Sequence, residues 1–193
     1  MDGIASGLVT KPDWIILSGY AGACQGDLAT GDTILATQVS YLGERFPLFH
    51  EKISAMETLR LGPMASVDNI ASEKEKGELK KKDFLAVEME AGQILKALGA
   101  RLPCPMIMVR VILDRLGYNF PAVIGKALFS STKTSWFWTM KGFLNPWNWG
   151  ELVSLWKMSK KANVELHKVL KMVILGLNSF SLIFNLEFIR FFP

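Results

Sequence analysis

Two short apolar runs, separated by a helical stretch, constrain the fold more than any other feature of this chain. Residues 84–87 (FLAV) and 106–113 (MIMVRVIL) have the length and continuous apolar character of buried strands. Residues 89–98 between them read as a helix that Gly99 ends. Strands joined by such a crossover run parallel in a sheet covered by helices. We therefore expect an α/β fold, a three-layer sandwich whose central sheet, mostly parallel or mixed, is flanked by helices.

Acidic residues follow both of these predicted strands. Glu88, Met89 and Glu90 come directly after the first strand, and Asp114 closes the second. If the strands are parallel, their carboxyl ends meet at one edge of the sheet, where open α/β sheets bind ligands. The sequence therefore predicts a site built from Glu88, Met89, Glu90 and Asp114.

Two more strands are expected nearer the N-terminus. Residues 14–18 (WIILS) read as a buried strand that enters a small-residue turn, Gly19–Ala23. Those glycines would let the backbone approach a ligand closely, although an ordinary tight turn explains them equally well. Residues 33–40 (TILATQVS) are rich in β-branched types and read as a second strand. Residues 41–64 contain two prolines and are expected to be loop or edge structure.

Two helices complete the expected fold. Ser72 and Glu75 have the spacing of a capping box, which predicts a helix over residues 73–82. Residues 149–173 have apolar side chains at helical spacing with lysines on the other faces, and Asn148 is the expected cap. The remaining stretch is apolar but interrupted by polar residues that would be costly inside a bilayer. We divide the chain into a domain over residues 1–172 and an apolar tail over residues 173–193.

Composition limits the class of protein. A chain of 193 residues, half of them apolar, can bury one core, and its net charge of +4 does not suggest a nucleic-acid-binding protein. Eight lysines against two glutamates lie between Lys126 and Met172, which indicates either an anionic partner or a solvated helix face. The two cysteines, Cys24 and Cys104, form no metal-binding spacing and fit a reducing cytoplasm.

The segment AVEMEA, residues 86–91, resembles the superfamily of nucleoside phosphorylases and nucleosidases, which includes methylthioadenosine/S-adenosylhomocysteine nucleosidase. Other segments stand in the order of that superfamily: WIILSGYAGAC, GDLATGD, ASVDNIASEKEKGEL and VRVILD. The resemblance implies cleavage of the N-glycosidic bond of a purine nucleoside, a small-molecule substrate, without a metal or organic cofactor. It also implies a homo-oligomer.

The resemblance implies a role for each site residue. Glu90, with Glu88 beside it, would hold the ribose hydroxyls, Met89 would pack beneath the sugar, and Asp114 would act at the base. The chemistry is consistent with these roles, because one carboxylate can accept both hydrogen bonds of a vicinal diol. A protonated carboxyl can stabilise the departing base by general acid catalysis. Strand-end charges that simply face water are the alternative explanation.

Several positions depart from the superfamily pattern. The turn residues Gly19, Tyr20, Ala21 and Gly22 would lie near the sugar, but Leu17 and Tyr20 stand where phosphorylases place Arg and Ser for phosphate. Hydrolysis is therefore expected rather than phosphorolysis. Leu113 replaces a common Ser, which leaves the base open. The first strand and a catalytic acid of the superfamily have no counterpart before Trp14. We therefore expect an N-terminally truncated chain, with a non-catalytic protein that binds a nucleoside or a partner subunit as the alternative.

Residues 136–193 suggest a peripheral membrane contact. Tryptophan beside lysine is typical of a lipid–water interface, and the region also resembles the hopanoid-associated branch of the superfamily. Aromatic packing in an ordinary core is the alternative. We expect a cytoplasmic protein with membrane association. His50 and His167 stand alone and are expected on the surface. The tryptophans of this segment are Trp136, Trp138, Trp147, Trp149 and Trp156.

Overall fold

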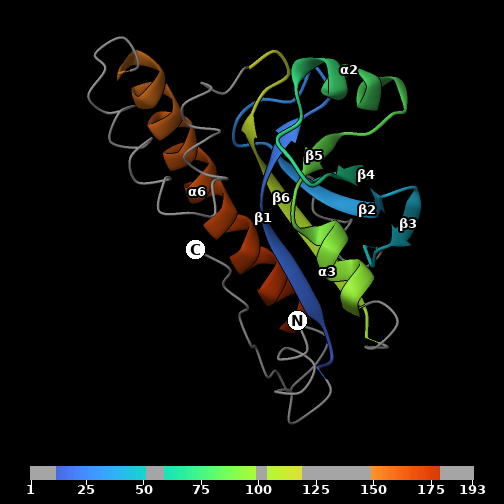
Figure 1. Cartoon of the computed structure of the whole chain (residues 1–193). Coiled ribbons are helices and arrows are strands. Elements are labelled where there is room, and N and C mark those ends of the chain that lie inside the picture. The colour runs from blue at the N-terminus through green and yellow to red at the C-terminus, as the bar shows by residue number, and fades with distance from the viewer. Residues whose placement is uncertain (1–11, 51–58, 99–103, 119–148, 179–193) are drawn as a thin grey trace, which may run out of the picture.

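The computed structural model describes residues 12–50, 59–98, 104–118 and 149–178. This part of the chain forms six strands and three helices; four strands come first, and from α2 onward helices and strands alternate (Figure 1). Predictions that fall on other residues, such as the caps Asn148 and Gly99 and the apolar tail from residue 179 onward, lie outside the described residues. The elements are β1 (Ile15–Ala23), β2 (Thr33–Tyr41), β3 (Glu44–Pro47), β4 (Leu59–Ser66), α2 (Glu73–Lys81), β5 (Ala86–Glu88), α3 (Ala91–Leu98), β6 (Met106–Asp114) and α6 (Trp149–Asn178).

The strands form one mixed sheet in the order β3-β2-β4-β5-β1-β6. Strand β2 also pairs with β6, so the sheet closes on itself and only β3 lies outside the ring. Three pairings are parallel, β1 with β6, β2 with β4, and β4 with β5, and the other three are antiparallel. The prediction of an α/β fold with a mixed central sheet is confirmed, although its closure was not expected.

The reasoning that predicted a parallel unit from residues 84–113 is wrong. Strand β1 lies between β5 and β6. It pairs antiparallel with β5 and parallel with β6. The helix α3 therefore does not connect two adjacent parallel strands. A single chain segment cannot reveal this, because the intervening strand comes from the N-terminal part of the sequence.

The prediction of loop or edge structure for residues 41–64 is also wrong for residues 59–64. Strand β4 is flanked on both sides, by β2 and β5, although it contains Pro63. Proline has no backbone N–H for the ladder. The register of β2 shifts between Ala36 and Gln38, beside Pro63, so the ladder is already irregular there. The other proline, Pro47, ends the outer strand β3.

Helices cover the sheet on both faces (Figure 1). Helix α6 packs along β6 and β1, while α3 packs on β2 and β4. The capping box predicted at Ser72 is confirmed, since Glu75 and Ser72 bond each other's backbone N–H groups. Helix α6 continues to Asn178, beyond the predicted end at residue 173. Within the described part of the chain, no helix is both long and apolar enough to cross a bilayer.

Alternate residues of β6 divide the core into two layers. Met108 and Ile112 pack in one cluster with residues of α3, whereas Val109 and Val111 pack in another with residues of α6. This alternation is the ordinary period of a strand, and it makes both faces of β6 apolar. A third, smaller cluster, around Cys24, lies beneath α2. Arg110 is a buried charge in the middle of this apolar strand.

A candidate site at the end of strand β1

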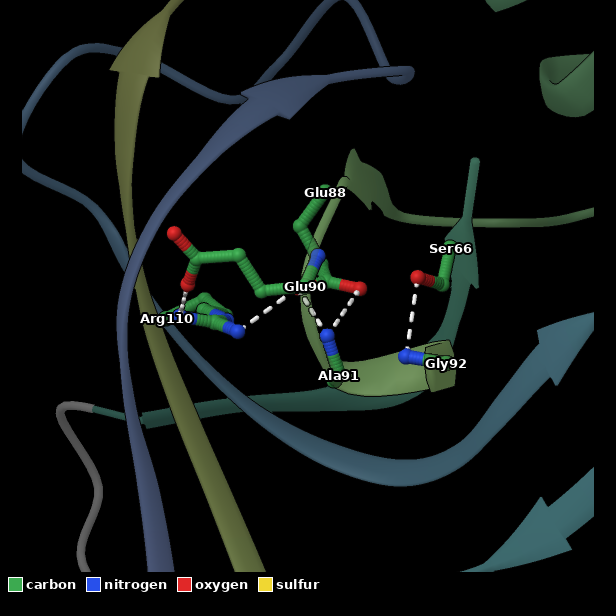
Figure 2. A network of polar contacts seen from close by, with 6 residues as sticks. All are labelled: Ser66, Glu88, Glu90, Ala91, Gly92 and Arg110. Carbon is green, nitrogen blue, oxygen red and sulfur yellow. Dashed lines mark hydrogen bonds and ion pairs between the residues drawn. The ribbon is translucent and has the colours of Figure 1, made fainter. Parts of the chain in front are cut away.

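A buried ion pair joins β6 to β5 across β1. The Nη2 atom of Arg110 donates to Oε2 of Glu88 at 2.6 Å, and both side chains are almost fully buried. Figure 2 shows the guanidinium beside Glu88 and Glu90. Burying two charges is favourable only when they are closely paired and otherwise hydrogen-bonded. This pair therefore fixes the distance between two strands that do not pair with each other.

Gly19 makes this ion pair sterically possible. It lies opposite Arg110 in the β1–β6 register. A Cβ atom at position 19 would collide with Nη1 of Arg110 and would lie 3.8 Å from Oε2 of Glu90. The absence of a side chain at position 19 lets Arg110 cross β1.

Glu88 also shapes the start of helix α3. Its carboxylate accepts hydrogen bonds from the backbone N–H groups of Glu90, at 3.0 Å, and of Ala91, at 2.9 Å. The Oγ atom of Ser66 accepts another from Gly92 at 2.9 Å (Figure 2). These oxygens satisfy N–H groups that have no partner within the helix. Glu88 is therefore saturated by the protein, which leaves its neighbour Glu90 as the carboxylate available to a ligand.

Glu90 is oriented but open to solvent. Its side chain is 62% exposed, and its Oε2 atom lies 3.5 Å from Nη1 of Arg110. Met89, between the two glutamates, is half-buried. Among the described residues, Nε and Nη1 of Arg110 have no hydrogen-bond partner. An exposed carboxylate next to unused guanidinium donors can bind a hydroxyl group or a water molecule.

Asp114 forms a second buried ion pair, with Lys76 of α2. The Nζ atom of Lys76 donates to Oδ2 of Asp114, and the side chains are only 4% and 5% exposed. Burial raises the pKa of Asp114, while the charge and hydrogen bond of Lys76 act in the opposite direction. Cys24 lies close to this pair, and burial raises the pKa of its thiol to about 12. The thiol is therefore neutral near pH 7.

The two ion pairs lie at the same end of β1 but on its opposite faces. Gly22 is in register with both Val87 of β5 and Asp114 of β6, so the predicted residues meet at one end of the sheet. However, the β1–β6 register skips Leu113, and this bulge turns Asp114 toward Gly22 instead of toward Gly19. The expected single cluster of carboxylates is therefore divided by β1.

The predicted turn over residues 19–23 is wrong, because β1 continues to Ala23. Small residues stand there because charged side chains cross Gly19 and Gly22, which is a packing requirement and not a turn. Ala21 belongs to the core. Tyr20 faces α6, where its hydroxyl donates to Asn163 at 3.3 Å. Of the four predicted turn residues, only the two glycines adjoin the ion pairs.

Sequence reasoning missed the cations of both pairs. Arg110 interrupts an apolar strand and Lys76 is the buried residue of an otherwise charged helix. The first carried a detectable signal, because a charge inside a continuous apolar run needs a buried partner. Lys76 carried no such signal in the sequence, because it is one of four lysines in a nine-residue helix. The described residues hold no group of three or more His, Cys, Asp or Glu side chains that could bind a metal.

Comparison with known proteins finds similarity only among solved structures. No protein-family profile matches the chain, and no curated protein does. The fold is similar to that of the 5′-methylthioadenosine/S-adenosylhomocysteine nucleosidase of Campylobacter jejuni, with 21% identity, a TM-score of 0.46, and coverage of 67% of this chain and 68% of that one.

Two further nucleosidase structures are similar. The Streptococcus pneumoniae enzyme in complex with 8-aminoadenine has 22% identity, a TM-score of 0.46, and coverage of 57% of this chain and 59% of that one. The Chlamydia trachomatis enzyme bound to adenine has 16% identity, a TM-score of 0.48, and coverage of 89% and 71%. The chain thus spans between 59% and 71% of these three proteins. All three are nucleosidases, and the likeness of this chain to them is one of fold.

The Arg110–Glu88 pair predicts a large and non-additive effect on stability. Arg110→Met should lower the free energy of unfolding by about 3–5 kcal/mol, because it leaves the Glu88 carboxylate buried without its cation. Adding Glu88→Gln should recover part of that loss, since the remaining group is then neutral. Urea denaturation of the two single variants and the double variant measures this coupling.

The matched control for this double-mutant experiment is the exposed ion pair between Lys81 and Glu78. Lys81→Met should change the free energy of unfolding by less than about 1 kcal/mol. Strictly additive effects of Arg110→Met and Glu88→Gln would contradict the assignment of a coupled buried pair.

Proposed function

We propose that this chain cleaves the N-glycosidic bond of a purine nucleoside or nucleoside-like compound by hydrolysis. Glu90 would bind the ribose hydroxyls, Met89 would pack beneath the sugar, and Asp114 would act at the base. The observation that carries the proposal is the exposed carboxylate of Glu90, held beside the buried Arg110–Glu88 pair. A carboxylate in this setting can accept both hydrogen bonds of a vicinal diol.

The charge of this cluster suits the chemistry. Breaking an N-glycosidic bond leaves positive charge on the sugar and negative charge on the base. Two carboxylates, Glu88 and Glu90, against one guanidinium leave one net negative charge beside the proposed sugar position. Fixed charge of this sign favours the cationic sugar of the transition state. The carboxylate pair therefore supports bond cleavage as well as substrate binding.

The same balance favours water over phosphate as the second substrate. Leu17 packs against the core and Tyr20 turns toward α6, so neither adds a cation to this cluster. The one guanidinium present is already opposed by two carboxylates, which would repel an anion. A non-catalytic protein that binds nucleosides is the alternative, and turnover distinguishes the two.

The first prediction of this proposal concerns binding. Glu90→Gln should weaken the binding of a purine riboside by about 1.5–3 kcal/mol, because an amide cannot accept both hydroxyl hydrogens as a carboxylate can. Isothermal titration calorimetry with a riboside and its 2′,3′-dideoxy analogue measures the effect. The matched control is Glu78→Gln, an exposed glutamate on α2. Equal affinities of parent and Glu90→Gln for the riboside would remove Glu90 from the site.

The second prediction concerns the reaction. Incubation of a purine nucleoside with the full chain in phosphate buffer should release the free base and free ribose. Chromatography of the products decides the matter, and the formation of ribose 1-phosphate would contradict hydrolysis. Binding of the nucleoside without any release of base would favour the non-catalytic alternative.

We also propose that the outer face of helix α6 contacts an anionic membrane surface. Apolar side chains are exposed on it, above all Trp156 at 61% and Leu175 at 55%. Lys160 lies over the Trp156 ring at 5.2 Å. Lysines and large apolar groups on one exposed face are typical of interfacial helices. The other predicted tryptophans, from Trp136 to Trp149, lie in segments whose side chains are not described. The exposed lysines of α6 are Lys157, Lys160, Lys161, Lys168 and Lys171.

This membrane proposal predicts that the full chain co-sediments with anionic vesicles at low salt and not with neutral ones. Changing Lys157, Lys160 and Lys168 to Gln should weaken vesicle binding by about 3 kcal/mol, roughly 100-fold, because each lysine contributes about 1 kcal/mol near an anionic surface. Changing Lys80, Lys81 and Lys82 to Gln is the matched control.

A chain that stays in the supernatant would disprove the membrane contact. If light scattering then gave the mass of a dimer, a second copy of the chain would be the better occupant of this face, in line with the proposed homo-oligomer.

A further inference from the structure

Lys76 is the buried residue of helix α2, whose other side chains are largely exposed and charged. The capping box at Ser72 fixes where α2 begins, and the backbone N–H of Lys76 bonds the carbonyl of Ser72 at 2.9 Å. The first turn of the helix therefore determines the direction of the Lys76 side chain, which points under α2 toward the end of β6.

Gly22 provides the space for this side chain. A Cβ atom at position 22 would lie 2.9 Å from Nζ of Lys76, 3.0 Å from Oδ2 of Asp114 and 3.1 Å from its Oδ1. Gly22, the ammonium group of Lys76 and the carboxylate of Asp114 therefore meet at one point. The bulge at Leu113 places Asp114 there, because it shifts Asp114 into register with Gly22.

The fold does not need a charged pair at this place. Replacing a buried ion pair by well-packed apolar groups often leaves a protein as stable or makes it more stable. The neighbouring cluster, Cys24, Ala65 and Val87, is apolar and shows that this part of the core can be built without charge. A lysine held against a carboxyl group can, in contrast, act as a general acid.

We propose that Lys76 supplies the proton that Asp114 passes to the leaving base, so that Lys76 is a positioning and proton-supplying residue of the reaction. This inference rests on the proposed function. In the step, the N-glycosidic bond breaks and its electron pair goes to the base. Asp114 gives a proton to a ring nitrogen and takes one from Nζ of Lys76. The pair ends as a neutral amine and a carboxylate, and the proton released by the attacking water restores it.

The surroundings of the pair suit this role. Burial raises the pKa of Asp114, which makes its carboxyl group easier to protonate in transit. Lys76 and Asp114 both act electrostatically on the thiol of Cys24, whose pKa of about 12 keeps it neutral. Glu88 and Arg110 lie on the opposite face of β1 and are paired with each other. Within the described part of the chain, Lys76 and Asp114 are therefore the two groups placed to exchange a proton here.

Lys76→Arg separates proton supply from charge. Arginine keeps the positive charge beside Asp114 but does not release its proton. We expect Lys76→Arg to keep the fold and the KM for a purine nucleoside and to lose about 100-fold or more in kcat, the usual contribution of general acid catalysis. The dependence of kcat on pH should differ from that of the parent, because the arginine has no proton to release. Gly77→Ala, next to Lys76 and free of contacts, is the matched control with parental kcat.

Two results would overturn the proposal. Parental kcat and an unchanged pH profile in Lys76→Arg would show that the pair is only an electrostatic support. A parent that turns over no purine nucleoside contradicts the proposed function instead, and the ¹³C carboxyl resonance of Asp114 then tests the pair in the ligand-free chain. Removal of the cation in Lys76→Met should raise the pKa of Asp114 above that of the parent. Identical titration curves would exclude any proton coupling.

Discussion

The fold depends on a guanidinium that crosses a strand. Arg110 comes from β6 and reaches Glu88 on β5, although β1 lies between them. In an apolar interior this charge is tolerable only with its partner in place. Three local features follow from that requirement: β1 has glycine at position 19, β5 ends in an acidic residue, and α3 begins where the carboxylate of Glu88 can also receive backbone N–H groups. The end of β1 is rigid because one salt bridge ties three strands and a helix together.

The sequence was most informative where local chemistry decides the structure. The capping box at Ser72 and the apolar runs of β2 and β6 follow from spacing and side-chain type alone, and they were predicted within one or two residues. Long-range pairing could not be predicted in this way. The insertion of β1 between β5 and β6, the closure of the sheet through β2, and the placement of β4 beside β2 depend on segments far apart in the chain.

The candidate site divides along the same line. Glu88, Glu90 and Asp114 could be picked out because they end apolar runs, and the structure brings them to one end of β1. The sequence did not show which cations pair with these carboxylates, nor on which face of β1 each carboxylate lies. Lys76 comes from a helix with several lysines, and Asp114 is turned away from Glu88 by a single skipped residue, Leu113. A bulge is a small change in sequence terms, yet it decides which side of a strand a side chain occupies.

For the proposed cleavage of an N-glycosidic bond, this division would have a chemical advantage. A sugar that becomes positive and a base that becomes negative need opposite environments, and one mixed cluster would neutralise itself. Strand β1 keeps the net negative Glu88–Glu90–Arg110 group on one face and the Lys76–Asp114 pair on the other. Gly19 and Gly22 mark these two places, three residues or about 10 Å apart along the strand. A nucleoside bound across the end of β1 would then present its sugar to one group and its base to the other.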